Sequence, residues 1–456
     1  MSWTLDDTIA AVGTPVGEGG IGIIRLSGPE ALAVLRALVE PARDPGRVWE
    51  PWRLRYGRVV DPGNGEAVDE VLAVWMPAPR TYTRQDIAEI HCHGGTLALG
   101  RILGLCLGGG ARLAEPGEFT LRAFLNGRID LAQAEAVLDV VRARSQAGLA
   151  LAVGQVGGAL SRPVGAVRGQ LLGALAHLEA ANDFPEDEIP TCDVAAVLQH
   201  AEEALSRLLA GAEMGMALRQ GWRCAIVGRP NVGKSSLLNA LLRCERAIVT
   251  PVPGTTRDTI EETAVMGGVP VVLVDTAGIN ETDDPVERLG VERSRQAMAG
   301  ADLVLLVVDG SEAVSLADRA IAEQVRGRPT VLAVNKADLP LVAEVEGLLP
   351  EGPAVRVSAR TGDGLPALER AVMEAILGSG KSADDRPVVS RPRHVEALRR
   401  AQEQVCAAQK ALAQAWPADC VGIDIAGALA ALGEITGETV TDDLVARIFA
   451  EFCLGK

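Results

Sequence analysis

The sequence predicts a multidomain protein with α/β and all-α parts, in which a nucleotide-binding α/β domain is inserted into a discontinuous helical domain. Three observations support this. The chain has 456 residues, too many for a single core. Short strand-like runs alternate with helical patterns over residues 216–378, as in a parallel sheet covered on both faces. Helical periodicity dominates residues 119–215 and 379–456 on either side.

The composition suits globular packing and excludes several classes of protein. Hydrophobic residues make up 48% and aromatic residues 3%, so the cores must be built from Ala, Val, Leu and Ile. No run approaches the ~18 apolar residues of a membrane span, and the first residues do not resemble a secretory signal. The eight cysteines are scattered, which favours reduced thiols and a cytoplasmic location. Because the net charge is −16, RNA would have to bind a local basic patch.

Residues 1–118 are predicted to form a mixed α/β domain. The expected elements are strands at 8–12, 21–26, 68–76 and 86–91, a helix at 29–39, and a turn at 61–65 that joins two strand-like runs. His91, Cys92 and His93 invite a metal site, but neighbouring strand residues point to opposite faces and cannot chelate one ion together. Gly94 and Gly95 indicate close backbone packing or a helix start instead.

From residue 119 the hydrophobic period becomes helical. Asp130 can cap a helix that begins at Leu131, with Gln133 at the reciprocal position of a capping box. One apolar stripe is then expected from Leu131, Ala134, Leu138 and Val141. The helical pattern continues to about residue 215 and resumes, after a linker at 378–385, for the rest of the chain.

The segment Gly228–Ser235 has the sequence G-x-x-x-x-G-K-S between a short apolar strand and a helical pattern. This is the phosphate-binding loop in its required context. Its glycines let successive N–H groups point at phosphate oxygens, and the helix dipole strengthens the field. We expect Lys234 to reach the β- and γ-phosphates and Ser235 to offer its hydroxyl to Mg²⁺. The alternative, a glycine-rich turn before an ordinary helix, is removed by motifs further along the chain.

Two further motifs lie at predicted strand ends. Asp275–Gly278 has the sequence D-T-A-G, in which the Asp would lie near Mg²⁺ and the Gly N–H could sense a γ-phosphate. Asn335–Asp338 has the sequence N-K-A-D, and Asp338 can accept hydrogen bonds from guanine N1–H and N2–H₂, a pair that adenine lacks. The predicted GTP site comprises Asn231, Val232, Gly233, Lys234, Ser235, Ser236, Thr250, Thr255, Thr256, Asp275, Thr276, Ala277, Gly278, Asn335, Lys336, Asp338, Ser358, Ala359 and Arg360.

Residues 250–258 are expected to form a switch loop, in which Thr256 gives a hydroxyl to Mg²⁺ when the γ-phosphate is present. Ile279 occupies the position where many small GTPases place a glutamine that orients water. An apolar side chain cannot do this, so a carboxylate elsewhere must. Glu287, in the segment after D-T-A-G, is the candidate for this carboxylate. From the sequence alone, however, the favoured interpretation of Glu287 is an ordinary exposed residue of a helix.

Over essentially its whole length the chain resembles the MnmE (TrmE) family of tRNA-modification GTPases, of the TrmE-Era-EngA-YihA-Septin-like superfamily. The resemblance is carried by GGIGIIRLSG at 19–28, DIAEIHCHGG at 86–95, PGEFTLRAFLNGRIDLAQAEAV at 116–137, GRPNVGKSSLLNAL at 228–241, PGTTRD at 253–258, DTAGIN at 275–280 and FCLGK at 452–456. It implies an N-terminal tetrahydrofolate-binding and dimerisation domain at 1–118, a helical domain at 119–215 and 379–456, and an inserted Ras-like G domain at 216–378.

The resemblance also implies an activity and partners. The chain would be a homodimeric GTP hydrolase that forms a heterotetramer with the FAD-dependent protein MnmG. Together they would add an aminomethyl or carboxymethylaminomethyl group to C5 of wobble uridine 34 in certain tRNAs. The one-carbon unit would come from 5-formyltetrahydrofolate or 5,10-methylenetetrahydrofolate. K⁺ would promote dimerisation of the G domains and so drive GTP hydrolysis.

Individual residues follow from the resemblance. It places K⁺ on Asn231, Thr250, Val252 and Thr255, and Mg²⁺ on Ser235 and Thr256. Glu287 matches the catalytic glutamate that orients water. The folate site would include Arg25, Glu89, Arg128 and Lys456, since folate offers carboxylates to basic groups and a pterin donor edge to a carboxylate. Cys453 is a possible nucleophile, with a core cysteine as the alternative.

Two other classes of GTPase compete with this interpretation. A ribosome-assembly GTPase could use the same G domain as a binding switch, but it would need neither the Arg25 and Glu89 pair nor the terminal FCLGK. A membrane-associated signalling GTPase is not supported, because the sequence has no lipidation motif and no amphipathic basic stretch.

Overall fold

The chain divides by its internal contacts into two compact units. Unit 1 comprises Met1–Leu138 and Ala430–Lys456, and unit 2 comprises Asp139–Leu429. The computed structural model describes residues 5–15, 17–43, 48–183, 192–244, 261–275, 298–349, 352–377, 388–452 and 455. Within these ranges no helix has the length and apolar character needed to cross a lipid bilayer.

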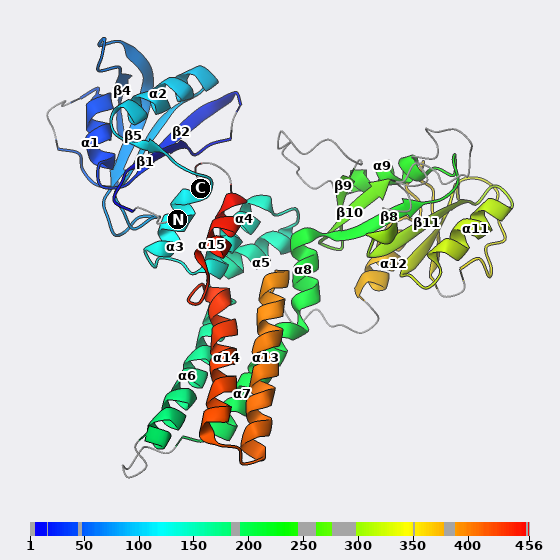
Figure 1. Ribbon diagram of the computed structural model, residues 1–456. Helices are drawn as coiled ribbons and strands as arrows, with labels where there is room; N and C mark the ends of the chain where they lie inside the picture. The colour runs from blue at the N-terminus through cyan, green and yellow to red at the C-terminus, as the bar shows by residue number, and fades with distance from the viewer. Residues whose placement is uncertain are drawn as a thin grey trace. The chain divides into compact units, whose positions relative to one another are not determined.

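Unit 1 is built on a sheet with the strand order β3-β4-β5-β6-β2-β1-β7 (Figure 1). The strands are β1 (Ile9–Val12), β2 (Gly19–Ser27), β3 (Val39–Pro41), β4 (Arg55–Val60), β5 (Ala67–Met76), β6 (Ile87–Gly94) and β7 (Arg112–Leu113). Helices α1 (Ala31–Leu38) and α2 (Thr96–Gly108) pack on one face. The predicted strands and helix are confirmed. Strands β3 and β7 were not predicted, because three and two residues are too short to show a hydrophobic period.

Alternation along β2 and β6 separates the core from the opposite face of the sheet. The core under α1 and α2 takes Ile24, Leu26, Ala88 and Ile90. Arg25 and Glu89 fall between these residues, and the antiparallel register places them directly opposite each other. Since successive strand residues point to opposite faces, both charged side chains lie on the face away from the helices.

Unit 1 has a second core between α3 (Glu118–Leu125), the first turns of α4 (Leu131–Arg142) and α15 (Asp442–Ala450). The predicted capping box is confirmed: Gln133 N donates to Asp130 Oδ1 at 2.8 Å, and Asp130 N donates to Gln133 Oε1 at 3.0 Å. The predicted stripe is wrong for Val141, which is 46% exposed. The last turns of α4 carry ion pairs of Asp139 with Arg219 and Arg391 in place of apolar packing.

The helices of unit 2 come from two segments of the sequence, one before and one after the segment that forms its sheet. They are α5 (Gln146–Val156), α6 (Ser161–Asp183), α7 (Val194–Ala210), α8 (Ala212–Gln220), α13 (Pro392–Ala413) and the part of α14 (Ala418–Thr436) up to Leu429. Helix α13 lies along α7 (Figure 1), where Gln402 donates to Ser206 Oγ at 2.8 Å. Segments that are far apart in the sequence therefore form one helical domain, as the periodicity predicted.

The sheet of unit 2 has the strand order β13-β12-β11-β8-β10-β9, and all neighbours are parallel except β9 and β10. Its elements are β8 (Trp222–Val227), α9 (Lys234–Cys244), β9 (Glu261–Met266), β10 (Val269–Asp275), β11 (Leu303–Asp309), α11 (Leu316–Val325), β12 (Thr330–Asn335), β13 (Ala354–Arg356) and α12 (Leu365–Leu377). Alternate residues of β8 and β11 enter different cores, one with α9 and α12, the other with α11. The parallel sheet covered on both faces is confirmed. Strand β9 was not predicted, because this edge strand lacks a continuous apolar run.

A buried guanidinium ties three parts of unit 1 together. The Arg122 side chain on α3 is 1% exposed and lies 2.9 Å from Glu118 Oε1. It also donates to the Asp7 carboxylate and to Gln85 Oε1, at 2.5 and 3.1 Å. Burial alone would raise the pKa of Glu118, but hydrogen bonds from Arg112, the Glu115 amide and Arg122 together lower it. The carboxylate therefore stays ionised, and the cluster depends on every partner.

We expect Arg122→Met to destabilise unit 1 by about 3–5 kcal/mol, because two carboxylates would lose their buried cation. Urea unfolding, followed by hydrogen exchange of amides in β1 and β2, measures this separately from unit 2. Arg58→Met is the matched control, since Arg58 pairs with Glu40 at 3.9 Å on the surface and should change stability by less than about 1 kcal/mol. Equal effects of the two substitutions would contradict the structural role of Arg122.

Candidate functional site

The first candidate site lies at the carboxyl edge of the unit 2 sheet. Strand β8 ends in the phosphate-binding loop, β12 ends in Asn335, and Ser358 follows β13. Strand β8 lies at a point where the strand order reverses. The next strands in the sequence, β9 and β10, lie on one side of it, and β11 to β13 lie on the other. The carboxyl ends of parallel strands at such a switch point form the usual ligand crevice of open α/β sheets.

The phosphate-binding loop has the backbone that its sequence predicts. Gly228 and Gly233 have φ values of 154° and 94°, and Asn231 has 66°. A Cβ at Gly228 would collide with the Val307 carbonyl, and one at Gly233 with the Asn335 amide, so both positions require glycine. Lys234 is the first residue of α9, and its ammonium donates to the carbonyl oxygens of Gly228 and Arg229 at 2.9 and 2.7 Å. The loop thus surrounds a cation at a helix N-terminus, where phosphate binds favourably.

Asn335 joins the phosphate-binding loop to the segment after β13. Its side chain is 2% exposed. Its Nδ2 donates to the Val232 carbonyl at 2.8 Å, and its Oδ1 accepts from the Ala359 amide at 3.1 Å. The buried amide is therefore satisfied at both ends, and it sets the distance between the two loops.

Asp338 is exposed, so its carboxylate is accessible to a ligand. Its Oδ1 accepts from Ser358 Oγ at 2.7 Å, and its Oδ2 lies 3.7 Å from Arg360 Nη1. The Ser358 hydrogen bond and the nearby cations lower the pKa of Asp338, so it is ionised at neutral pH. An ionised carboxylate in this place can accept two parallel hydrogen bonds from a purine edge.

The structure adds Asp309, which the sequence analysis missed, as a partner of the predicted residue Lys336. Lys336, at a φ of 64°, places its ammonium 2.5 Å from Asp309 Oδ2 at the end of β11. Burial raises the pKa of Asp309, but hydrogen bonds from Lys336 and Ser311 lower it overall. The available signal was the position of Asp309 at the end of β11, a buried strand of the same sheet.

Three more predicted residues of the nucleotide site lie at the ends of β10 and α9. Asp275 ends β10, and Ser235 and Ser236 lie in the first turn of α9. The following fall outside the described residues: Thr250, Val252, Thr255, Thr256, Thr276, Ala277, Gly278 and Glu287.

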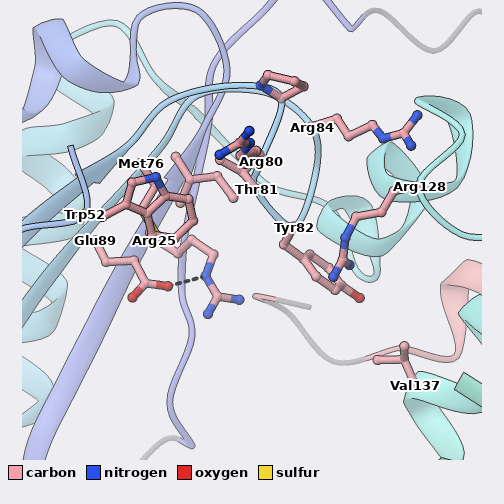
Figure 2. Close-up of a pocket in the computed structure, with 12 residues that line it drawn as sticks. Arg25, Trp52, Met76, Arg80, Thr81, Tyr82, Arg84, Glu89, Arg128 and Val137 are labelled. Carbon is pink, nitrogen blue, oxygen red and sulfur yellow. Dashed lines mark hydrogen bonds and ion pairs between the residues drawn. The ribbon is translucent and has the colours of Figure 1, made fainter. Parts of the chain in front are cut away.

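The second candidate site is a hollow of about 660 Å³ in unit 1 (Figure 2). Arg25 and Glu89 line it, with Arg25 Nε 2.8 Å from Glu89 Oε1. Arg128 lines it too, from the turn after α3, and its guanidinium carbon lies 4.7 Å from the centre of the Tyr82 ring. Three of the four residues predicted for one site are thus brought together from different parts of the chain.

The charge state of the hollow follows from its contacts. Burial raises the pKa of Glu89, but the charge and hydrogen bond of Arg25, together with His91, lower it overall. His91 Nε2 lies 3.1 Å from Glu89 Oε2. Arg25 Nη1 also donates to the Gly455 carbonyl at 3.4 Å, which brings the C-terminal segment to this face. Cys453 and Lys456 fall outside the described residues.

The side chains of the H-C-H-G-G segment, which begins in β6, do not converge on one point. His91 contacts Glu89, His93 Nδ1 lies 2.7 Å from Asp69 Oδ1, and Cys92 is buried in the core on the other face. The glycines fit both of their expected roles. A Cβ at Gly94 would collide with the Gly19 carbonyl, and Gly95 is the N-cap of α2.

The sheet and its edge motifs define a class of protein: a P-loop GTPase with a Ras-like G domain. Full-length relatives make this specific. The tRNA modification GTPase MnmE of Chloroflexus aurantiacus is 53% identical over 456 residues, covering 99% of this chain and all of that protein. The one from Roseiflexus castenholzii is also 53% identical, with 99% of each chain covered. The chain belongs to the MnmE family, and it is a GTP hydrolase that acts in tRNA modification.

Other comparisons cover parts of the chain. The family model for the GTP-binding protein TrmE N-terminus matches residues 8–128, and the model for the MnmE helical domain matches residues 131–453. A crystal structure of Era from Aquifex aeolicus is 26% identical, covers 40% of this chain and 66% of its own, and has a TM-score of 0.28. The G domain of T. maritima FeoB is 25% identical, covers 34% and 98%, and has a TM-score of 0.26.

We expect Asp338→Asn to weaken GTP binding and to favour xanthosine nucleotides, because the amide replaces a carboxylate that accepts from the guanine edge. Calorimetry with GTP and xanthosine triphosphate measures both effects. Asp363→Asn is the matched control, since Asp363 is exposed in the neighbouring loop and accepts from Thr361 Oγ1 at 2.7 Å. Unchanged GTP affinity in Asp338→Asn would remove the assignment of Asp338 to base recognition.

Proposed function

We propose that the chain uses GTP hydrolysis to drive modification of C5 of wobble uridine 34 in certain tRNAs, as a cytoplasmic homodimer that forms a heterotetramer with the flavoprotein MnmG. The added group is aminomethyl or carboxymethylaminomethyl. Its one-carbon unit comes from 5-formyl- or 5,10-methylenetetrahydrofolate. One observation carries the proposal: Arg25, Glu89 and Arg128 line a single hollow in unit 1 although they are distant in sequence.

The hollow fits a tetrahydrofolate in size and in chemistry. Its volume, about 660 Å³, lies in the range of roughly 300–1,000 Å³ that is usual for small-molecule sites. Glu89 can accept from the pterin N–H edge, while Arg128 and Lys456 bind the glutamate carboxylates. Tyr82 and Trp52 offer aromatic surface at the same hollow (Figure 2). When bound, the folate supplies the one-carbon unit. Cys453 is a candidate nucleophile for that chemistry.

The nucleotide site receives its roles in the same proposal. The phosphate-binding loop from Asn231 to Ser236 holds the phosphates, with the segments at 275–278 and 358–360 completing the site. Asp338 selects guanine, and Ser235 and Thr256 hold Mg²⁺. Glu287 orients the attacking water as the catalytic residue. This assignment is supported by the carboxyl-edge geometry of the described residues.

K⁺ is the proposed activator of hydrolysis. Asn231, Thr250, Val252 and Thr255 would hold it, where it neutralises charge that develops on the phosphates. Support comes from Asn231, which lies at the bend of the phosphate-binding loop with a φ of 66°. Dimerisation of the G domains across their nucleotide faces would complete the K⁺ site.

The domain division is part of the proposal. The folate-binding and dimerisation domain spans 1–118, the helical domain 119–215 and 379–456, and the G domain 216–378. The family-model matches at 8–128 and 131–453 support this order. The described sheet of the G domain, from β8 to β13 with α12, falls between these helical segments.

We expect GTP hydrolysis to be faster in K⁺ than in Na⁺ at equal ionic strength. Asn231→Gly should lose this difference but keep nucleotide binding, because glycine tolerates the positive φ and lacks the amide oxygen. Single-turnover rates in the two salts, with calorimetry for nucleotide affinity, measure both properties. Equal wild-type rates in K⁺ and Na⁺ would exclude the cation role.

Binding of 5-formyltetrahydrofolate tests the modification function directly. Arg25→Ala and Glu89→Ala should each cost on the order of 1–3 kcal/mol of binding, because each removes a charge-assisted contact. GTP binding should not change. Arg36→Ala is the matched control, since Arg36 is an exposed arginine on α1 that does not line the hollow. No measurable folate binding by the wild type would overturn this function for unit 1.

A further inference from the structure

The hollow of unit 1 carries more arginines than a simple folate needs. Arg80, Arg84 and Arg128 line it together with the Arg25–Glu89 pair. Among the described residues, none of these three has a carboxylate within ion-pair distance, whereas Arg25 is matched by Glu89. A folate with a single glutamate brings two carboxylates. Three unmatched guanidinium groups in a chain with a net charge of −16 therefore indicate a ligand with more negative charge.

The loop that carries two of these arginines is held in place. Arg84 has a φ of 58°, a left-handed conformation that must be held by surrounding contacts. Its Nη1 donates to the Asn126 carbonyl at 2.9 Å, and Asn126 Nδ2 donates back to the Thr83 carbonyl at 2.6 Å. Thr81 Oγ1 closes the loop on the Gln85 carbonyl at 2.6 Å. The loop is thus preorganised, which lowers the entropic cost of ordering it around a ligand.

The positions of the arginines suit an extended chain of charges. Arg80, Arg84 and Arg128 all line the hollow and are labelled in Figure 2. The Arg84 guanidinium keeps donors beyond the one bonded to Asn126, since a guanidinium has five N–H groups. All three arginines are exposed to solvent. Each guanidinium can pair with a separate carboxylate in bidentate geometry.

We propose that the folate ligand of this site is a polyglutamylated tetrahydrofolate, and that Arg80 and Arg84 bind the carboxylates of the added γ-linked glutamates. The inference rests on the proposed folate function and specifies its substrate class. A γ-glutamyl tail is thin and flexible, and it adds one carboxylate per residue. These properties match three exposed arginines that line one hollow and have no carboxylate partner among the described residues. An RNA backbone could also contact exposed arginines, but these guanidiniums line the same hollow as Glu89, beside the proposed pterin contact.

The test compares 5-formyltetrahydrofolate carrying one glutamate with the same compound carrying three, by calorimetry on the full-length protein. Wild type should bind the triglutamate roughly tenfold more tightly, as two exposed charge pairs would give. The preference should shrink as salt is raised, because exposed pairs are screened. Arg80→Gln should reduce the preference without changing affinity for the monoglutamate, and Arg80→Lys should restore part of it. Arg36→Gln, with the same loss of charge on α1, should leave it intact.

The outcomes separate this inference from the function on which it rests. Equal affinity of the wild type for the two folates would overturn the polyglutamate inference and leave the folate site standing. No binding of either folate would overturn the folate function itself. If Arg80→Gln weakened tRNA binding while the folate preference stayed unchanged, the arginine would serve RNA, and the inference would be wrong. Thermal unfolding of each variant checks that the substitution leaves the stability of the protein unchanged.

Discussion

The alternation of side chains along a β-strand decides where both sites of this protein lie. In unit 2 the parallel strands bury residues on both faces, under α9 and α12 on one side and α11 on the other. Only the strand ends remain for chemistry, and the phosphate-binding loop, Asn335 and Asp338 gather at that edge. In unit 1, α1 and α2 cover one face of a mainly antiparallel sheet, and the opposite face, partly covered by Phe119 of α3, carries the hollow. Arg25 and Glu89 take that face because the register sets them opposite each other.

Both sites are stiffened by buried polar groups. Asn335 is satisfied on one side by the Val232 carbonyl and on the other by the Ala359 amide, so the phosphate and base loops cannot move independently without losing a hydrogen bond. In unit 1, Arg122 joins Glu118 to Gln85, the residue that follows the arginine-bearing loop. Removing a partner from such a buried cluster leaves an unpaired polar group. Ligand contacts in each site are therefore prepared before the ligand arrives, which is the usual condition for tight and selective binding.

The distribution of charge distinguishes the two sites within an acidic chain. The net charge of −16 repels polyanions in general, so each anion site needs its own local cations. Lys234 at the N-terminus of α9 meets this need for phosphates. Several arginines line the hollow of unit 1, and we propose that they meet it for a folate with several carboxylates, as the phosphate-binding loop does for the nucleotide.

The sequence by itself determined the fold class, the phosphate-binding loop, the N-K-A-D motif and the capping box of α4, because each depends on local spacing or hydrophobic period. It could not assign Arg25, Glu89 and Arg128 to one site without family resemblance, since they come from two strands and a turn that meet only through sheet register and helix packing. It missed the contact of Lys336 with Asp309 for the same reason, and it missed β9 because this edge strand lacks a continuous apolar run. It also misplaced Val141, because a helical period does not show where a neighbouring core ends. Motifs of neighbouring residues can be recognised in the sequence, whereas distant side chains come together only when strands pair and helices pack.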